Sequence, residues 1–248
     1  MDIIQDISFV WFLIIFLGAL VQGATGFGFA LVVTPLMVMF MEVEALIVLV
    51  ITLSFFTSAL MSWKLRRYAE WGLIKYLLAS SIVGSALGSY LLKVWGPHDL
   101  PKLIIAVFVI LFSLLIYFEV SKPIEKEEVG GMVAGFFSGV FTTLTSFGGP
   151  PVVLLLSNQK KLPLYFKGTI SLYFFIKSFF SILLLIVITG VRPDIVLVST
   201  IFIPFVLLGW RAGFLLANRI SVKHFRLAVL FIIMTAALRI IVNYFAWA

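Results

Sequence analysis

A glycine-rich break interrupts a long apolar stretch near the start of this chain, and the same pattern returns in the second half. The first copy, Gly18 to Phe40, reads GALVQGATGFGFALVVTPLMVMF, and the second, Gly135 to Ser157, reads GFFSGVFTTLTSFGGPPVVLLLS. Phe27-Gly28 and Phe147-Gly148 match in register, 120 residues apart. Two broken helices placed alike in two halves are typical of internal structural repeats, with the working part of the protein at the breaks.

The composition identifies a membrane protein. The chain is 62% hydrophobic and 12% charged, with a mean hydropathy of +1.20, whereas soluble domains are about half apolar. Its apolar runs are about twenty residues long, which indicates membrane-spanning helices, because barrel strands run to only about ten residues. No removable signal peptide is expected, since no basic region precedes the first apolar stretch.

Six apolar segments have the length of ordinary membrane spans, and the two broken stretches do not. Residues 7–41 would form a helix of about 52 Å, too long for one crossing, so we expect a fold-back at the glycines. The six predicted spans are residues 44–63, 70–92, 101–119, 166–189, 194–217 and 225–246.

The loop cations favour a fold-back over a single long crossing. If each broken stretch returns to the side from which it came, eleven of fourteen loop cations face the cytoplasm, and only Lys93, Lys102 and Arg192 face outward. Single crossings would split the same residues eight to six, which is no bias. The eleven are Lys64, Arg66, Arg67, Lys122, Lys126, Lys160, Lys161, Lys167, Arg219, Lys223 and Arg226. The pattern therefore predicts two re-entrant hairpins, with both termini outside.

The predicted fold is an all-α polytopic membrane protein made of two inverted repeats. Three spans separate the hairpins, so they enter from opposite sides. Residues 1–120 form the first repeat, with its hairpin at 7–41; residues 121–130 form a central cytoplasmic loop; residues 131–248 form the second repeat, with its hairpin at 131–158. Each half also carries one Gly-x-x-x-Gly pair, at Gly84/Gly88 and Gly209/Gly213, for which close helix packing is the main interpretation.

The two hairpin tips are the candidate binding site. Irregular backbone at membrane depth is tolerated only where it is buried in protein or lines a cavity. The second arm of each hairpin begins at its tip, so its free N–H groups and positive dipole end point to the bilayer middle, which is a ready anion site. The alternative is that the glycines merely permit tight packing. The candidate residues at the tips are Gln22, Gly23, Thr25, Gly26, Gly28, Thr145, Ser146, Gly148 and Gly149.

Three cations fall deep inside predicted spans without a deep carboxylate to neutralise them. Lys177 lies near the bilayer midplane, whereas Arg211 and Arg239 lie about eight and seven residues from a span end. Buried charges are costly and are candidates for function, and Tyr173 shares a helix face with Lys177. The alternative roles are hydrogen bonding between helices for Lys177 and Arg239, or an outward-reaching side chain for Arg239. No deep carboxylate is present for proton or sodium coupling through an acidic side chain.

Several other chemistries find no support in the sequence. The chain has no cysteine and only His98 and His224, so a cysteine or histidine metal site is not expected. No nucleophile–base pair or nucleotide-binding motif is visible, so we expect no enzyme activity and no cofactor. The net charge of +7 resides mostly in short loops, which membrane orientation explains better than nucleic acid. The expected partners are a small anion and the lipid bilayer, with a homo-oligomer left open.

At its two broken stretches the chain resembles the TauE/SafE family of bacterial membrane transporters. The likeness rests on GALVQGATGFGFALVVTP and GFFSGVFTTLTSFGGPP, the Gly-x-x-x-Gly spans and the central polar loop, and it covers nearly the whole chain. The resemblance implies a multi-pass carrier in the bacterial plasma membrane that exports sulfite, organosulfonates or similar small sulfur oxyanions. The unpaired cations agree with such a substrate. The alternatives are an anion channel and a carrier of another small carboxylate or oxyanion.

Overall fold

The computed structural model describes residues 8–38, 40–96, 100–117, 127–158, 162–190, 194–217 and 234–242. All regular structure in these ranges is helical. The helices are α1 Phe9–Thr25, α2 Phe29–Met37, α3 Val43–Leu65, η1 Arg66–Tyr68, α4 Trp71–Trp95, α5 Leu100–Tyr117, α6 Glu127–Thr145, α7 Gly149–Asn158, α8 Pro163–Thr189, α9 Asp194–Ser199, η2 Thr200–Phe202 and α10 Ile203–Leu216. Residues 234–242 are also helical.

Four described helical segments are long and apolar enough to cross a membrane, and they coincide with four predicted spans. They are Val43–Tyr68, Trp71–Trp95, Pro163–Thr189 and Asp194–Leu216. The span predicted at 101–119 corresponds to α5, described to Tyr117, whereas most of the span predicted at 225–246 lies outside the described residues. Together with the composition, these helices identify a multi-pass membrane protein.

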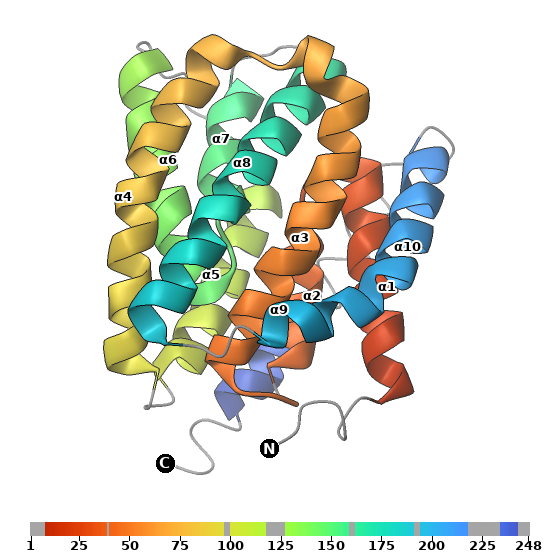
Figure 1. Ribbon diagram of the computed structural model, residues 1–248, viewed down its shortest axis with the longest axis vertical. Helices are drawn as coiled ribbons and strands as arrows, with labels where there is room; N and C mark the ends of the chain where they lie inside the picture. The colour runs from red at the N-terminus through yellow and green to blue at the C-terminus, as the bar shows by residue number, and fades with distance from the viewer. Residues whose placement is uncertain are drawn as a thin grey trace.

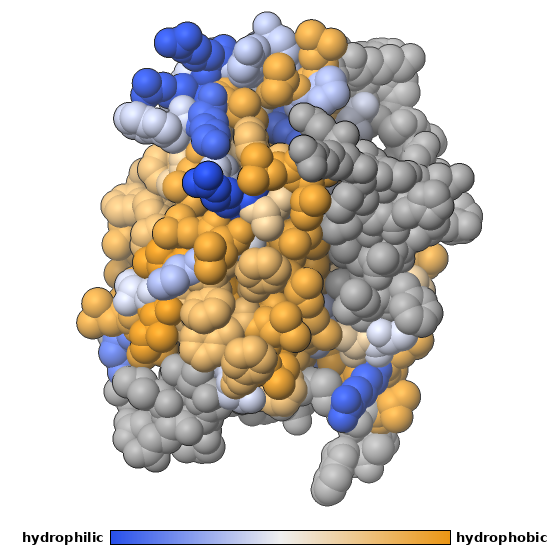
Figure 2. Space-filling model, turned by 90° about the vertical axis from the view of Figure 1, so that its right-hand side faces the viewer, coloured by the Kyte–Doolittle hydropathy of each residue, from blue (hydrophilic) through white to orange (hydrophobic). Residues whose placement is uncertain are grey.

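The outer surface has the polarity that a bilayer requires. Large apolar side chains stand exposed along the long helices, among them Val83, Val187 and Leu208. Figure 2 shows apolar residues over most of the visible middle of the molecule, with hydrophilic residues gathered toward its upper end. Lipid tails would cover this apolar surface without an energetic penalty, because hydrocarbon is as apolar as these side chains.

Both predicted breaks exist, and both broken helices fold back on themselves. α1 ends at Thr25 and α2 begins at Phe29, and Gly18 of α1 lies directly against Val33 of α2. In the second copy, the Ser138 hydroxyl of α6 donates to the carbonyl of Gly148 at 2.5 Å, just before α7. Residues 18 and 33 would be about 22 Å apart in a continuous helix, so each pair of arms forms a helical hairpin.

The second hairpin begins earlier than the sequence predicted. α6 starts at Glu127, although residues 127–130 were expected in the central loop. Glu127 and Glu128 lie in the first turn, where carboxylates favour the positive end of the helix dipole. Tyr76 of α4 donates to Glu128 at 2.8 Å, and Gly131 packs on Leu73 and Tyr76. These contacts extend the helix into a stretch whose composition looks like a loop.

Glycines set the close packing of two helix pairs, as the Gly-x-x-x-Gly spacing predicted. Gly209 and Gly213 of α10 lie against the carbonyls of Phe16 and Leu20 in α1. Gly84 and Gly88 of α4 lie against α6, where the carbonyls of Phe136 and Val140 occupy the space of a side chain. A hairpin arm from each half is therefore packed against a long helix of the other half (Figure 1).

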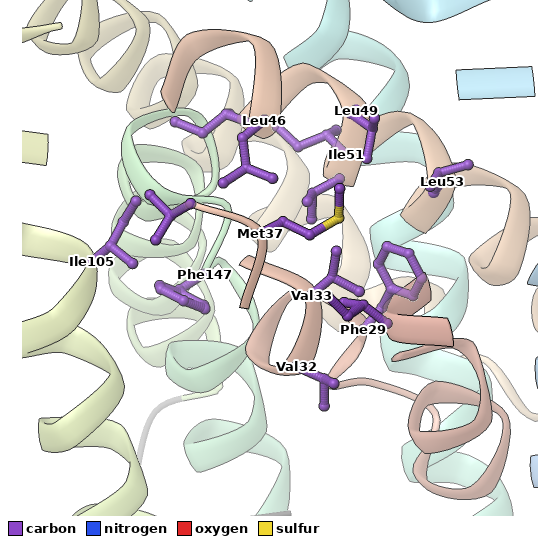
Figure 3. Packing of buried hydrophobic residues seen from close by; sticks show 14 of the residues in the cluster. Phe29, Val32, Val33, Met37, Leu46, Leu49, Ile51, Leu53, Ile105 and Phe147 are labelled. Carbon is purple, nitrogen blue, oxygen red and sulfur yellow. The ribbon is translucent and has the colours of Figure 1, made fainter. Parts of the chain in front are cut away.

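The two hairpins cross each other rather than meet end to end. Phe147 of the second tip lies in the apolar cluster of α2 and α3, beside Met37 and Ile105 (Figure 3). Phe27 of the first tip packs on both apolar clusters, the second of which includes Val152 of α7 and Ile170 of α8. Each tip thus contacts the other half: the Ser146 hydroxyl meets that of Thr34 in α2, and the ring of Phe27 meets that of Phe166 in α8.

Candidate functional site

The two hairpin tips have the same local construction. Gly26 and Ser146 occupy equivalent positions and both adopt left-handed backbone, with φ of 90° and 65°. The amide of Gly26 donates to the carbonyl of Gln22 at 2.7 Å, and that of Ser146 donates to the carbonyl of Thr142 at 2.8 Å. Glycine adopts left-handed backbone without strain, whereas serine does so at a cost. The second tip therefore keeps the same geometry although its residue favours it less.

Thr25 and Thr145 brace these tips in the same way. The Thr25 hydroxyl lies 2.9 Å from the carbonyl of Val21 and accepts from the amide of Phe27 at 3.3 Å. The Thr145 hydroxyl donates to Phe141 at 2.7 Å and accepts from the amide of Phe147 at 3.4 Å. Neither threonine lines the central cavity. Both were predicted to bind substrate, and in the structure each hydrogen-bonds within its own tip.

A small cavity lies where the hairpins cross. It leaves about 50 Å³ in which the centre of a water molecule fits. Both hairpin tips contribute to its wall, together with α3, α6 and α8. The lining residues are Gln22, Phe27, Gly28, Phe29, Ala30, Leu31, Ile51, Ser54, Ser58, Thr142, Ser146, Phe147, Gly148, Gly149, Pro150, Phe174, Lys177 and Ser178.

The first turns of α2 and α7 both border this cavity. Phe29, Ala30 and Leu31 begin α2, and Gly149 and Pro150 begin α7. The first amides of a helix have no acceptor within the helix and carry the positive end of its dipole. Pro150 has no N–H to offer. The backbone donors at this wall therefore come mainly from α2 and from Gly149.

Lys177 places its amino group at the same cavity. The residue is 3% exposed, and its Nζ donates to Ser138 Oγ at 3.0 Å and to Thr142 Oγ1. The rings of Tyr173 and Phe174 have centroids 5.2 and 4.7 Å from Nζ. No carboxylate pairs with Lys177 among the described residues. The cavity thus combines two helix N-termini with a buried amine, all of which attract anions.

Hydroxyl and amide groups complete the wall of the cavity. Gln22, 3% exposed, donates from Nε2 to Ser58 Oγ at 3.0 Å. Ser58 and Ser178 both line the cavity and stand 120 residues apart, as the hairpin repeats do. Tyr173 is fully buried behind Lys177 and donates to Ser138 at 2.9 Å. Within the described ranges, no three carboxylate, imidazole or thiol groups come together as a metal site.

The structure gathers most of the predicted tip residues and leaves two of the three deep cations apart. Gln22, Gly28, Ser146, Gly148, Gly149 and Lys177 meet at the cavity. Gly23 instead packs on the carbonyl of Trp210, so its lack of a side chain serves the contact of α1 with α10. Arg211 and Arg239 are exposed and do not line the cavity.

Lys167 makes a contact that the sequence did not predict. It was expected to face the cytoplasm at the start of the span 166–189, and it lies in α8, where it donates to the carbonyl of Ala24 at 2.7 Å. That carbonyl belongs to the last turn of α1, where cations are favoured by the helix dipole. Lys167 also packs on Gly26 and therefore secures the first tip from the side.

Other site residues missed from the sequence are hydroxyl residues on apolar helices: Ser54, Ser58, Ser138, Thr142 and Ser178. One signal could have found some of them. Applying the 120-residue offset of the tips pairs Gln22 with Thr142 and Ser58 with Ser178, and all four line the cavity.

The chain matches one known protein family over nearly its whole length. The model of the family described as "Sulfite exporter TauE/SafE" matches residues 11–240. Comparison with curated proteins and with solved structures gave no match. The matched range includes both hairpins, the cavity between them and all four long apolar helices. The protein is therefore a member of the TauE/SafE sulfite exporter family.

Proposed function

We propose that this protein exports sulfite and related small sulfur oxyanions from the cytoplasm, with the anion bound in the cavity between the crossed hairpins. Membership of the family implies a membrane exporter of sulfur compounds. The observation that carries the binding site is the meeting of the first turns of α2 and α7 with the amino group of Lys177 at one cavity. The two helix N-termini and the amino group can all attract a small anion.

The size of the cavity supports a small ligand. A water needs about 10–15 Å³ of such space, so the cavity has room for roughly three to five water-sized atoms. Sulfite has four heavy atoms. A long-chain organosulfonate would need further space, which movement of the hairpins would have to open.

The mechanism proposed is alternating access by two inverted repeats, each with a re-entrant hairpin. Support comes from the exchanged packing of the two halves: α1 packs on α10, and α6 packs on α4. Each tip also contacts the other half: Ser146 shares a hydrogen bond with Thr34 of α2, and Phe27 packs on Phe166 of α8. Rocking of one hairpin against the other would open the central cavity first to one side and then to the other, as in other transporters with broken helices. The protein would lie in the bacterial plasma membrane with both termini outside.

Sulfite flux in proteoliposomes tests this function. Wild-type protein should give saturable flux of labelled sulfite that is accelerated by unlabelled sulfite on the opposite side. Lys177→Gln removes a charge-assisted hydrogen-bond donor worth about 1.5–3 kcal/mol, so binding should weaken by roughly tenfold or more. Lys75→Gln is the matched control, because Lys75 is exposed on α4.

The result also separates the alternatives. Flux of neither sulfite nor any sulfonate above that of empty liposomes would refute export of sulfur oxyanions. Unitary currents without acceleration from the opposite side would identify an anion channel. Full flux in Lys177→Gln would remove Lys177 from the site.

A further inference from the structure

The hydrogen bonds around Lys177 use only two of the three protons that a charged amino group carries. Nζ donates to Ser138 and Thr142. Both hydroxyls have already donated their own protons: Ser138 to the carbonyl of Gly148 at 2.5 Å, and Thr142 to the carbonyl of Ser138 at 2.6 Å. Each hydroxyl can therefore only accept from the lysine. Two acceptors match the two N–H groups of a neutral amine.

No described group offers a counter-charge or a third acceptor to Nζ. Tyr173, on the same helix, is the one titratable side chain that faces it, and its hydroxyl donates to Ser138. The neighbouring described elements present only uncharged side chains: Ser138 and Thr142 from α6, Gln22 from α1, Ser54 and Ser58 from α3, and Pro150 from α7. The remaining side of Nζ opens to the cavity.

The third proton of a charged Lys177 therefore needs an acceptor that comes from the cavity. A buried ammonium without a counter-charge costs several kcal/mol, and the charge becomes favourable when an anion pairs with it. An empty site favours the neutral amine, and a site occupied by an oxyanion favours the ammonium. Anion binding and protonation of Lys177 are thus linked, and each strengthens the other.

We infer that this carrier moves one proton together with each oxyanion, with Lys177 as the proton carrier; this inference rests on the proposed transport function. On the loading side a proton from water adds to the lone pair of Nζ as the anion enters. The ammonium and a monovalent anion cross as a neutral pair. On the far side the anion leaves and the proton returns from Nζ to water. The empty site, with a neutral amine, then faces the loading side again. No net charge crosses with a monovalent anion.

Accumulation of methanesulfonate at equilibrium tests the coupling, because this anion carries no proton of its own near neutral pH. With a gradient of one pH unit and no membrane potential, the inference predicts about tenfold accumulation on the alkaline side. With a potential of 100 mV and no pH gradient, it predicts no accumulation. A carrier of the bare anion would give the reverse: no response to pH, and about 50-fold accumulation from the 2.3 kcal/mol per 100 mV that one charge gains. That pattern would overturn the inference.

Two further measurements keep the test decisive. If the wild type moves sulfite and not methanesulfonate, currents after a jump in bisulfite concentration at pH 6 replace the accumulation assay. Absence of a sustained current supports the inference, and a sustained current overturns it.

Lys177→Arg keeps a permanent charge, so its flux should lose the response to pH and become voltage-dependent. If that variant does not fold, the wild-type result decides alone. Absence of flux for both anions refutes the transport function itself, whereas voltage-driven flux refutes only the coupling.

Discussion

The amino group of Lys177 packs directly against Gly148, in space that a side chain at position 148 would fill. A Cβ there would also collide with the hydroxyl of Thr142, which is a hydrogen-bond acceptor of Lys177. The second tip therefore needs glycine at position 148 so that the lysine can reach the cavity. This contact ties the glycine pattern of the hairpin to the buried lysine at the site.

Gly148→Ala should displace Lys177 and destabilise the protein. Overpacking of a tight site typically costs about 1–3 kcal/mol, and flux should fall with the displaced amine. Gly149→Ala is the control for stability, because its Cβ would meet only Phe174 at 3.8 Å and Phe27 at 4.0 Å. Thermal unfolding in detergent measures both variants. Equal midpoints for the two alanine variants would contradict the tight contact at position 148.

The crossing of the hairpins predicts a specific cross-link. The hydroxyls of Thr34 and Ser146 share a hydrogen bond between α2 and the second tip, and the chain has no cysteine of its own. The double variant Thr34→Cys/Ser146→Cys should form a disulfide on mild oxidation and should stop transport until it is reduced. In the control pair Thr34→Cys/Ser138→Cys, position 138 lies about 12 Å from position 146 along the chain direction of α6, so this pair should not cross-link. Efficient cross-linking of the control pair alone would contradict the crossing.

Membrane orientation has its own test at two exposed cations. Arg67 lies in η1, after α3, and Lys93 lies near the end of α4, so the two stand at opposite ends of one helix. In whole cells, an impermeant thiol reagent should label Lys93→Cys and should leave Arg67→Cys unlabelled until the membrane is permeabilised. The reverse pattern would overturn the predicted orientation of both hairpins.

The contact of α1 with α10 should be sensitive to one methyl group. The carbonyl of Leu20 fills the space beside Gly213, so Gly213→Ala should force the helices apart and lower stability by about 1–3 kcal/mol. Gly72→Ala meets no atom within 4 Å and should be neutral or stabilising, since alanine is favoured over glycine in helices by about 1 kcal/mol. Equal loss of stability in the two variants would show that the close approach at Gly213 is unimportant.

The sequence was sufficient to predict the helix breaks and the buried lysine. A glycine-rich run recurs at matching places in two apolar stretches, and the first stretch is too long for one crossing. The tips at Gly26 and Gly148 could therefore be located without tertiary information. Lys177 was identifiable because a cation in the middle of a long span cannot reach either membrane surface. Both features depend on local sequence and on distance along one helix.

The features that the sequence could not predict depend on which side of a helix faces the protein interior. Rise per residue placed Arg211 and Arg239 at depth, but it says nothing about direction, and both are exposed. Ser138 and Thr142 look like ordinary small residues in an apolar helix until α6 packs beside α8 and brings them to Lys177. The crossing of the hairpins likewise arises from the contacts of Phe27 and Phe147 with the opposite halves, which no local pattern encodes.

Direct binding of sulfite to the purified protein is the most direct test of the central claim, that an oxyanion occupies the cavity against Lys177. Titration calorimetry under anaerobic conditions should give one saturable site in the wild type and in Lys75→Gln. Lys177→Gln should bind at least about tenfold more weakly, as expected for loss of a charged hydrogen-bond donor. Equal affinity of the wild type and Lys177→Gln would contradict the account and place the anion elsewhere.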